Sequence, residues 1–137
     1  MYSEYSVSII IPSYNSEKTI KSCLDKITIE SKRLKSEIIV VDDCSTDKTT
    51  DVIKTFQNVK LIQLESNRGA GNARNKGAES AIYEHLCFID SDIDISDKSI
   101  LNLVKRLKED DNPGSVAATP DLHNLNRTSW SSNFVCL

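Results

Sequence analysis

The chain has 137 residues, a length typical of one domain that can bury its own hydrophobic core. With 39% apolar and 27% charged residues it has the composition of a globular protein, and its net charge of −3 argues against a nucleic-acid-binding protein, which usually carries a basic face. No apolar run approaches the ~20 residues of a membrane helix, and the polar first residues do not resemble a signal peptide. The four cysteines lack metal-ligand spacing, so we expect reduced thiols in a cytoplasmic protein without a transmembrane segment.

Strands and helices are predicted to alternate along the first 120 residues. Short runs rich in β-branched residues predict strands, and apolar residues at helical spacing, such as Ile20, Leu24 and Ile27, predict helices. This alternation indicates the α/β class, with a mostly parallel sheet flanked by helices on both faces. We expect a single domain over residues 1–137, in which residues 121–137 stay unassigned. The expected strands are residues 7–11, 37–41, 59–64, 86–89 and 116–119, and the expected helices are one capped by Ser16, residues 47–56, residues 71–83 and one from residue 96 or 97.

Two of the predicted strands end in paired acids. The strand at 86–89 leads into Asp90 and Asp92, and the strand at 37–41 leads into Asp42 and Asp43. Ligands of open parallel sheets bind outside the carboxyl ends of the strands, and Mg²⁺ is usually held by one or two carboxylates together with substrate phosphates. The two junctions therefore favour one shared metal–phosphate site. Aspartate is also common in turns and helix caps, which is the alternative interpretation of each junction.

A third motif, residues 67–77, joins the strand at 59–64 to the next helix. Its glycines allow close approach of the backbone to a ligand, the start of a helix favours anions, and Arg68 and Arg74 offer forked donors for phosphate. The alternative is a plain helix start with two surface arginines. A dinucleotide-binding fingerprint does not fit, because Arg74 stands where the third glycine belongs and the motif follows the third strand.

Two other kinds of protein share an acid–x–acid motif. A phosphatase of the haloacid dehalogenase type also places it after an apolar strand, but usually near the start of the domain and with Thr or Val where this chain has Asp94. A calcium loop beginning at Asp90 would need Gly at position 95 and Glu at position 101, where the chain has Ile95 and Leu101.

Taken in order, four motifs resemble those of family-2 glycosyltransferases, enzymes of the GT-A fold that use nucleotide-sugar donors. They are residues 7–15 with their aromatic-bearing loop, residues 39–47, residues 67–77, and the acid–x–acid motif at residues 90–92. The resemblance covers residues 7 to about 119. One departure is Cys44, where the family usually has glycine.

The resemblance implies a role for six residues. Pro12 and Tyr14 would flank the nucleotide base, and Asp43 would accept its ring N–H, which both uracil and guanine offer. Arg68 would lie near the base and the phosphates, Asp90 would approach the ribose, and Asp92 would bind Mg²⁺ or Mn²⁺. The metal would neutralise the diphosphate leaving group. A UDP-sugar is the favoured donor, and a GDP-sugar is the second choice.

The resemblance also implies a second half that binds the acceptor and supplies a carboxylate base. No residue of this chain matches that base, so the acceptor and the catalytic residue stay unknown, and any association with a membrane would come through the acceptor. A non-catalytic nucleotide-binding or assembly module is therefore the alternative function. In the fold resembled, a strand of the second half lies between those at 86–89 and 116–119. Unless residues 130–137 fill this place, we expect an open sheet edge and self-association.

Overall fold

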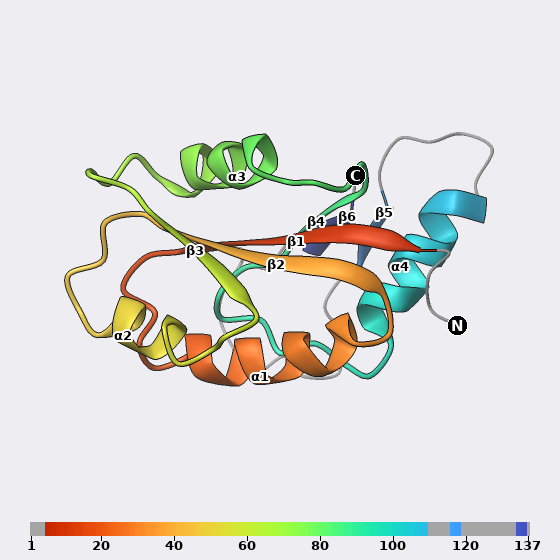
Figure 1. Ribbon diagram of the computed structural model, residues 1–137, viewed down its shortest axis with the longest axis horizontal. Helices are drawn as coiled ribbons and strands as arrows, with labels where there is room; N and C mark the ends of the chain where they lie inside the picture. The colour runs from red at the N-terminus through yellow and green to blue at the C-terminus, as the bar shows by residue number, and fades with distance from the viewer. Residues whose placement is uncertain (1–4, 110–115, 119–133, 137) are drawn as a thin grey trace.

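The computed structural model describes residues 5–109, 116–118 and 134–136. These residues form one six-stranded sheet in the order β3-β2-β1-β4-β6-β5 (Figure 1). Strands β1 to β4 are parallel, and β6 pairs antiparallel with both β4 and β5. The elements are β1 Ser6–Ser13, α1 Ile20–Ser31, β2 Lys35–Asp42, α2 Thr49–Ile53, β3 Val59–Gln63, α3 Ala70–Glu79, β4 Leu86–Phe88, α4 Ser99–Glu109, β5 Val116–Ala118 and β6 Phe134–Cys136.

The sheet has helices on both faces, as the alternating pattern predicted. Helix α3 covers one face, and α1 and α2 lie on the other (Figure 1). The side chains of β1 alternate accordingly: Ile9 and Ile11 belong to the larger core with α1 and α4, whereas Ile10 packs with Ala73 of α3. Because β1 and β2 are central and covered on both faces, they read as continuous apolar runs, which is why the sequence pattern identifies them well. The predicted α/β class and mostly parallel sheet are confirmed.

Helix α3 ends at Glu79, four residues before the end predicted from its apolar positions. Beyond the helix, backbone amides find side-chain acceptors on the sheet. Glu37 of β2 accepts the Ile82 N–H at 2.7 Å, and the Ser8 hydroxyl of β1 accepts the Tyr83 N–H at 3.1 Å. These bonds replace the helical pattern and direct the chain into β4. Such long-range partners are invisible to a local sequence pattern.

The position of α3 on the sheet depends on Gly77. A Cβ atom there would lie 2.3 Å from Ile10 Cγ2 and 3.3 Å from Val41 Cγ2, whereas a Cβ at Gly71 of the same helix meets nothing within 4 Å. We therefore expect Gly77→Ala to lower the free energy of unfolding by about 1–3 kcal/mol or more through overpacking. Gly71→Ala is the matched control and should raise it by about 0.5–1 kcal/mol. Urea denaturation measures both, and a neutral Gly77→Ala would contradict this packing.

The place between β4 and β5 is filled by β6, from the segment considered for it in the sequence analysis. Cys87 pairs with Cys136 and Phe88 with Val135 in the β4–β6 ladder. The structure thus contradicts the premise that β4 has an open edge, because both of its sides are paired. Residues 119–133, most of the segment left unassigned in the sequence analysis, lie outside the described residues.

With β4 paired on both sides, we expect the chain to sediment as a monomer at micromolar concentration. Analytical ultracentrifugation checks this, and a dimer would show that another surface drives association.

Within the described ranges, no helix is both long and apolar enough to cross a membrane.

Candidate functional site

A cavity of about 940 Å³ lies at the carboxyl ends of β1 and β4 and beside the start of α3. Five of the six residues assigned by the resemblance line it: Pro12, Tyr14, Asp43, Asp90 and Asp92. The reason is topological, because β1, β2 and β4 are parallel and adjacent, so the residues that follow them meet at one edge of the sheet.

The loops after β1 and β2 are fastened to each other. The Asn15 side chain accepts the Thr46 N–H at 2.8 Å, and the Asn15 N–H donates to Ser45 Oγ at 2.9 Å. Asn15 takes a left-handed backbone conformation, with φ of 47°, which asparagine tolerates. Tyr14 is thereby presented with 48% of its surface exposed beside the cavity, while Pro12 is buried. An exposed aromatic ring on an anchored loop suits stacking against a flat ligand.

The adjacent acids after β2 have different partners. Asp42 accepts the Ser45 N–H at 3.0 Å and the Ser45 hydroxyl at 2.5 Å, which is the turn role considered for it. Asp43 is 2% exposed and accepts the N–H groups of Arg68 at 2.9 Å and Gly69 at 2.7 Å. Asp43 therefore holds the loop that leads into α3. Each of its carboxylate oxygens has a second lone pair, so one can still accept a ligand N–H from the cavity.

The two arginines of the third motif lie in different places. The Arg68 side chain is exposed, donates from Nε to Ser66 Oγ at 3.3 Å and does not line the cavity. Arg74, one turn into α3, lines the cavity and donates to Asp90 Oδ1 at 2.6 Å. The structure thus does not place Arg68 among the residues that line the cavity, and its role near the base and the phosphates stays a prediction. Arg74 is a site residue that our assignment omitted, and its position one turn into the helix is the signal that could have identified it.

The acid–x–acid motif has one paired and one unpaired carboxylate. Asp90 is paired with Arg74, while no hydrogen bond or ion pair to Asp92 is found among the described residues. Asp92 is exposed at the cavity. An unpaired carboxylate is a hard oxygen donor that fits Mg²⁺ or Mn²⁺, with Asp90 close by. The described part of the chain has no cluster of three metal-ligating side chains. The remaining coordination positions would therefore fall to phosphate oxygens and water, as is usual for Mg²⁺.

Cys23 of α1 contacts the backbone of this motif. Its thiol donates to the Asp90 carbonyl, with 3.7 Å between Sγ and O. Burial, reinforced by the negative charges of Asp92 and Asp90, raises the pKa of Cys23 to about 12. The thiol is therefore neutral at physiological pH and serves as a small packing residue and weak donor.

Cys44, the departure from the family pattern, has a φ of 64°. This left-handed conformation is strained for cysteine and free for glycine. We expect Cys44→Gly to raise the free energy of unfolding by about 1 kcal/mol. Lys48→Gly is the control in the same loop, because Lys48 has φ of −83° and is the N-cap of α2, where glycine is tolerated, so its free energy of unfolding should stay nearly unchanged. Thermal unfolding of both variants checks the prediction, and a Cys44→Gly variant no more stable than Lys48→Gly would contradict it.

Comparisons with known proteins agree with this architecture. The family model described as "Glycosyl transferase family 2" matches residues 8–134. Poly-beta-1,6-N-acetyl-D-glucosamine synthase of Staphylococcus epidermidis is 30% identical over 121 residues, which are 86% of this chain and 29% of the synthase. The solved structure of Staphylococcus aureus TarS 1-349 in complex with UDP-GlcNAc superposes with a TM-score of 0.67 at 34% identity, over 76% of this chain and 31% of that one.

A third similar protein is the mannosyltransferase PcManGT of Pyrobaculum calidifontis, solved in complex with GDP-Man and Mn²⁺. It superposes with a TM-score of 0.76 at 28% identity, over 86% of this chain and 36% of that one. The chain thus spans about a third of the length of each of these relatives. The phosphatase and calcium-loop interpretations lose their support, since the match extends over nearly all described residues. The matched family and the shared GT-A fold lead to one conclusion: the chain belongs to glycosyl transferase family 2.

Proposed function

We propose that this chain binds a nucleoside-diphosphate sugar together with Mg²⁺ or Mn²⁺ and forms the donor half of a glycosyltransferase. A UDP-sugar is the favoured donor, because TarS was solved with UDP-GlcNAc, and glucosyl-3-phosphoglycerate synthase of Mycobacterium tuberculosis, 26% identical to this chain, was solved with Mn²⁺, UDP and phosphoglyceric acid. A GDP-sugar is the second choice, since PcManGT was solved with GDP-Man. The acceptor stays unassigned, and so does the catalytic base.

The observation that carries this proposal is the set of side chains around one cavity. An exposed aromatic ring, a buried carboxylate and an unpaired carboxylate converge there from three strand ends, as Tyr14, Asp43 and Asp92. In our proposal Tyr14 and Pro12 bound the base and Asp43 accepts its ring N–H. Asp90, held by Arg74, faces the ribose, and Asp92 binds the metal on the diphosphate. The bound metal would neutralise the leaving group, and the chain's own task is positioning.

Thermal-shift measurements with UDP, GDP and TDP, each in Mn²⁺ or EDTA, test the proposal. A ligand that binds only the folded state raises the unfolding midpoint, so one nucleotide should raise it in Mn²⁺ and much less in EDTA. No shift with any nucleotide in either condition would contradict the proposal. Inorganic pyrophosphate is the control that separates recognition of the base from recognition of the phosphates.

The alternative is a nucleotide-binding module without catalysis. Release of UDP from a UDP-sugar, by transfer or by hydrolysis, separates the two functions. Steady turnover by this chain would assign it an enzyme activity of its own. Binding without turnover is the result expected for a nucleotide-binding module.

A further inference from the structure

We propose that helix α1 positions the loop that carries Asp92, and that the buried carboxylate of Glu30 is the positioning residue at the far end of this loop. The acid loop, as we call it, comprises residues 90–98 between β4 and α4. The proposal rests on the proposed function, in which Asp92 binds the metal, and it assigns to Glu30 no contact with the donor. It is carried by the contacts that α1 and the residues flanking it make along the whole acid loop.

The near end of the acid loop is held by two contacts. The Cys23 thiol donates to the Asp90 carbonyl, and the hydroxyls of Ser16 and Ser91 share a hydrogen bond of 2.7 Å. Further along, Lys26 forms an ion pair with Asp94. Both side chains of this pair are exposed, so it contributes little by itself. Cys23, Lys26 and Glu30 are spaced by three and four residues, which places them on one face of the helix.

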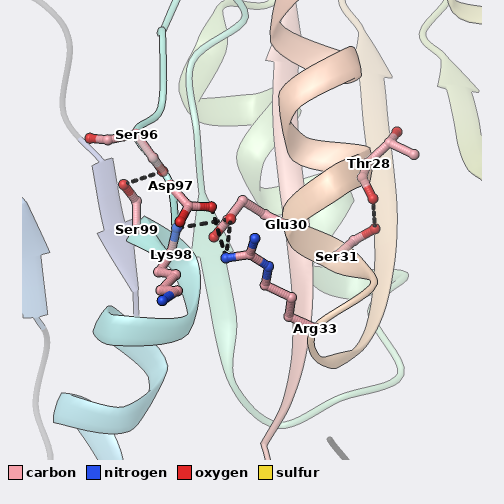
Figure 2. Close-up of polar contacts among 8 residues, drawn as sticks. All are labelled: Thr28, Glu30, Ser31, Arg33, Ser96, Asp97, Lys98 and Ser99. Carbon is pink, nitrogen blue, oxygen red and sulfur yellow. Dashed lines mark hydrogen bonds and ion pairs between the residues drawn. The ribbon is translucent and has the colours of Figure 1, made fainter.

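The far end is held by a buried charged group (Figure 2). Glu30 is 3% exposed, and its Oε1 accepts the Lys98 N–H at 2.9 Å and lies 3.4 Å from Arg33 Nη1. Arg33 in turn pairs with Asp97 at 2.8 Å. Glu30 of α1 thus binds Lys98, and Arg33, just beyond the helix, binds the preceding residue, Asp97. Buried carboxylates persist where such partners compensate their charge.

Lys98, whose N–H donates to Glu30, has an unusual backbone conformation. Its φ is 61°, a left-handed conformation that non-glycine residues keep only where the surroundings hold them. The hydrogen bond from its N–H to Glu30 is such a restraint, at the residue where the acid loop turns into α4. Without Glu30, the amide would have no partner at this position and the turn would relax.

Asp92 depends on these restraints because it has none of its own among the described residues. Its exposed side chain lies between the anchor at Asp90 and Ser91 and the anchor at Asp97 and Lys98. Ile95, 8% exposed, adds a core contact between them. Loss of Glu30 should therefore loosen the second half of the acid loop while the first half and the core contact remain. A partial loss of metal-dependent binding follows, rather than its abolition.

The test uses Glu30→Ala, with two readouts. Amide hydrogen exchange without ligand should become faster in the second half of the acid loop, residues 95–98, and stay unchanged at the anchor formed by Asp90 and Ser91. The ratio of UDP affinity in Mn²⁺ to that in EDTA should fall by about 3- to 10-fold, the scale of one hydrogen bond, while affinity in EDTA stays unchanged. Glu30→Gln keeps an acceptor for the Lys98 N–H and should retain most of the ratio. If Glu30→Ala does not fold, Arg33→Ala gives a milder form of the same test.

Glu37→Ala is the matched control. Glu37 is also a carboxylate that accepts a backbone N–H outside the regular elements, that of Ile82, but this contact lies on the α3 side of the chain. This variant should speed exchange after α3 and leave the Mn²⁺ ratio intact. Equal falls of the ratio in both variants, or faster exchange spread evenly over the chain with Glu30→Ala, would overturn the proposal. If the wild type has no Mn²⁺ dependence, the proposed function fails, and the exchange pattern alone then decides whether Glu30 positions the acid loop.

Discussion

Replacing Asp92 with alanine is expected to abolish the Mn²⁺ dependence of UDP binding. Asp92 is the carboxylate at the cavity for which no partner is found among the described residues, so its loss would remove the proposed metal ligand without breaking an internal contact. In the wild type we expect Mn²⁺ to tighten UDP binding by at least about tenfold, which is about 1.4 kcal/mol. Calorimetry in Mn²⁺ and in EDTA should give one and the same affinity for Asp92→Ala.

Asp94→Ala is the control for this prediction. Asp94 is an exposed acid two residues further along, paired with Lys26, and it does not line the cavity. Its removal should leave the Mn²⁺ effect nearly intact. If both variants lose the effect to the same extent, the loss reflects the summed negative charge near the cavity, and Asp92 is not a metal ligand.

Replacing Asp43 with alanine is expected to cost about 1.5–3 kcal/mol of UDP affinity, as for a hydrogen bond to a charged group. If this carboxylate accepts the ring N–H of the base, the loss should appear for UDP and be absent for inorganic pyrophosphate. Calorimetry with the two ligands, both in Mn²⁺, measures the difference. The structure gives Asp43 a second task, because its oxygens also hold the amides of Arg68 and Gly69.

A variant of the neighbouring acid, Asp42, distinguishes the two tasks of Asp43, base recognition and support of the loop. Asp42 is equally buried and fixes the adjacent turn through Ser45, but it does not line the cavity. Asp42→Ala should therefore disturb the loop after β2 without a preference between UDP and pyrophosphate. If Asp43→Ala weakens both ligands equally, Asp43 serves the loop alone and the assignment to the base is wrong.

The sheet and the location of the site follow from local patterns in the sequence. Strands β1 and β2 are buried on both faces, so their apolar runs are unmistakable, and parallel topology then brings the acids after β2 and β4 to one edge. Pattern alone located the two acid pairs, because each follows directly on a predicted strand, whereas Tyr14 was assigned through the family resemblance. The roles of these side chains toward a donor stay predictions.

Other features depend on contacts that no local pattern contains. Arg68 and Arg74 are equivalent as charges, and only the helical phase after Gly69, whose φ is 89°, turns Arg74 toward Asp90 and leaves Arg68 outside the cavity. The end of α3 is decided by acceptors on Glu37 and Ser8. Strand β6 has three residues, too few for a periodicity, and its antiparallel pairing with β4 and β5 is a long-range contact.

Paramagnetic broadening by Mn²⁺ in the amide NMR spectrum of the chain tests the central claim most directly. Substoichiometric Mn²⁺ added with UDP should selectively broaden the signals of residues 90–92 and of the loop at Tyr14, because both surround the cavity. Mn²⁺ without UDP should broaden them far less, since phosphate oxygens complete the coordination. Broadening that is centred elsewhere, or that is the same with and without UDP, would contradict a metal–diphosphate donor site at this edge of the sheet.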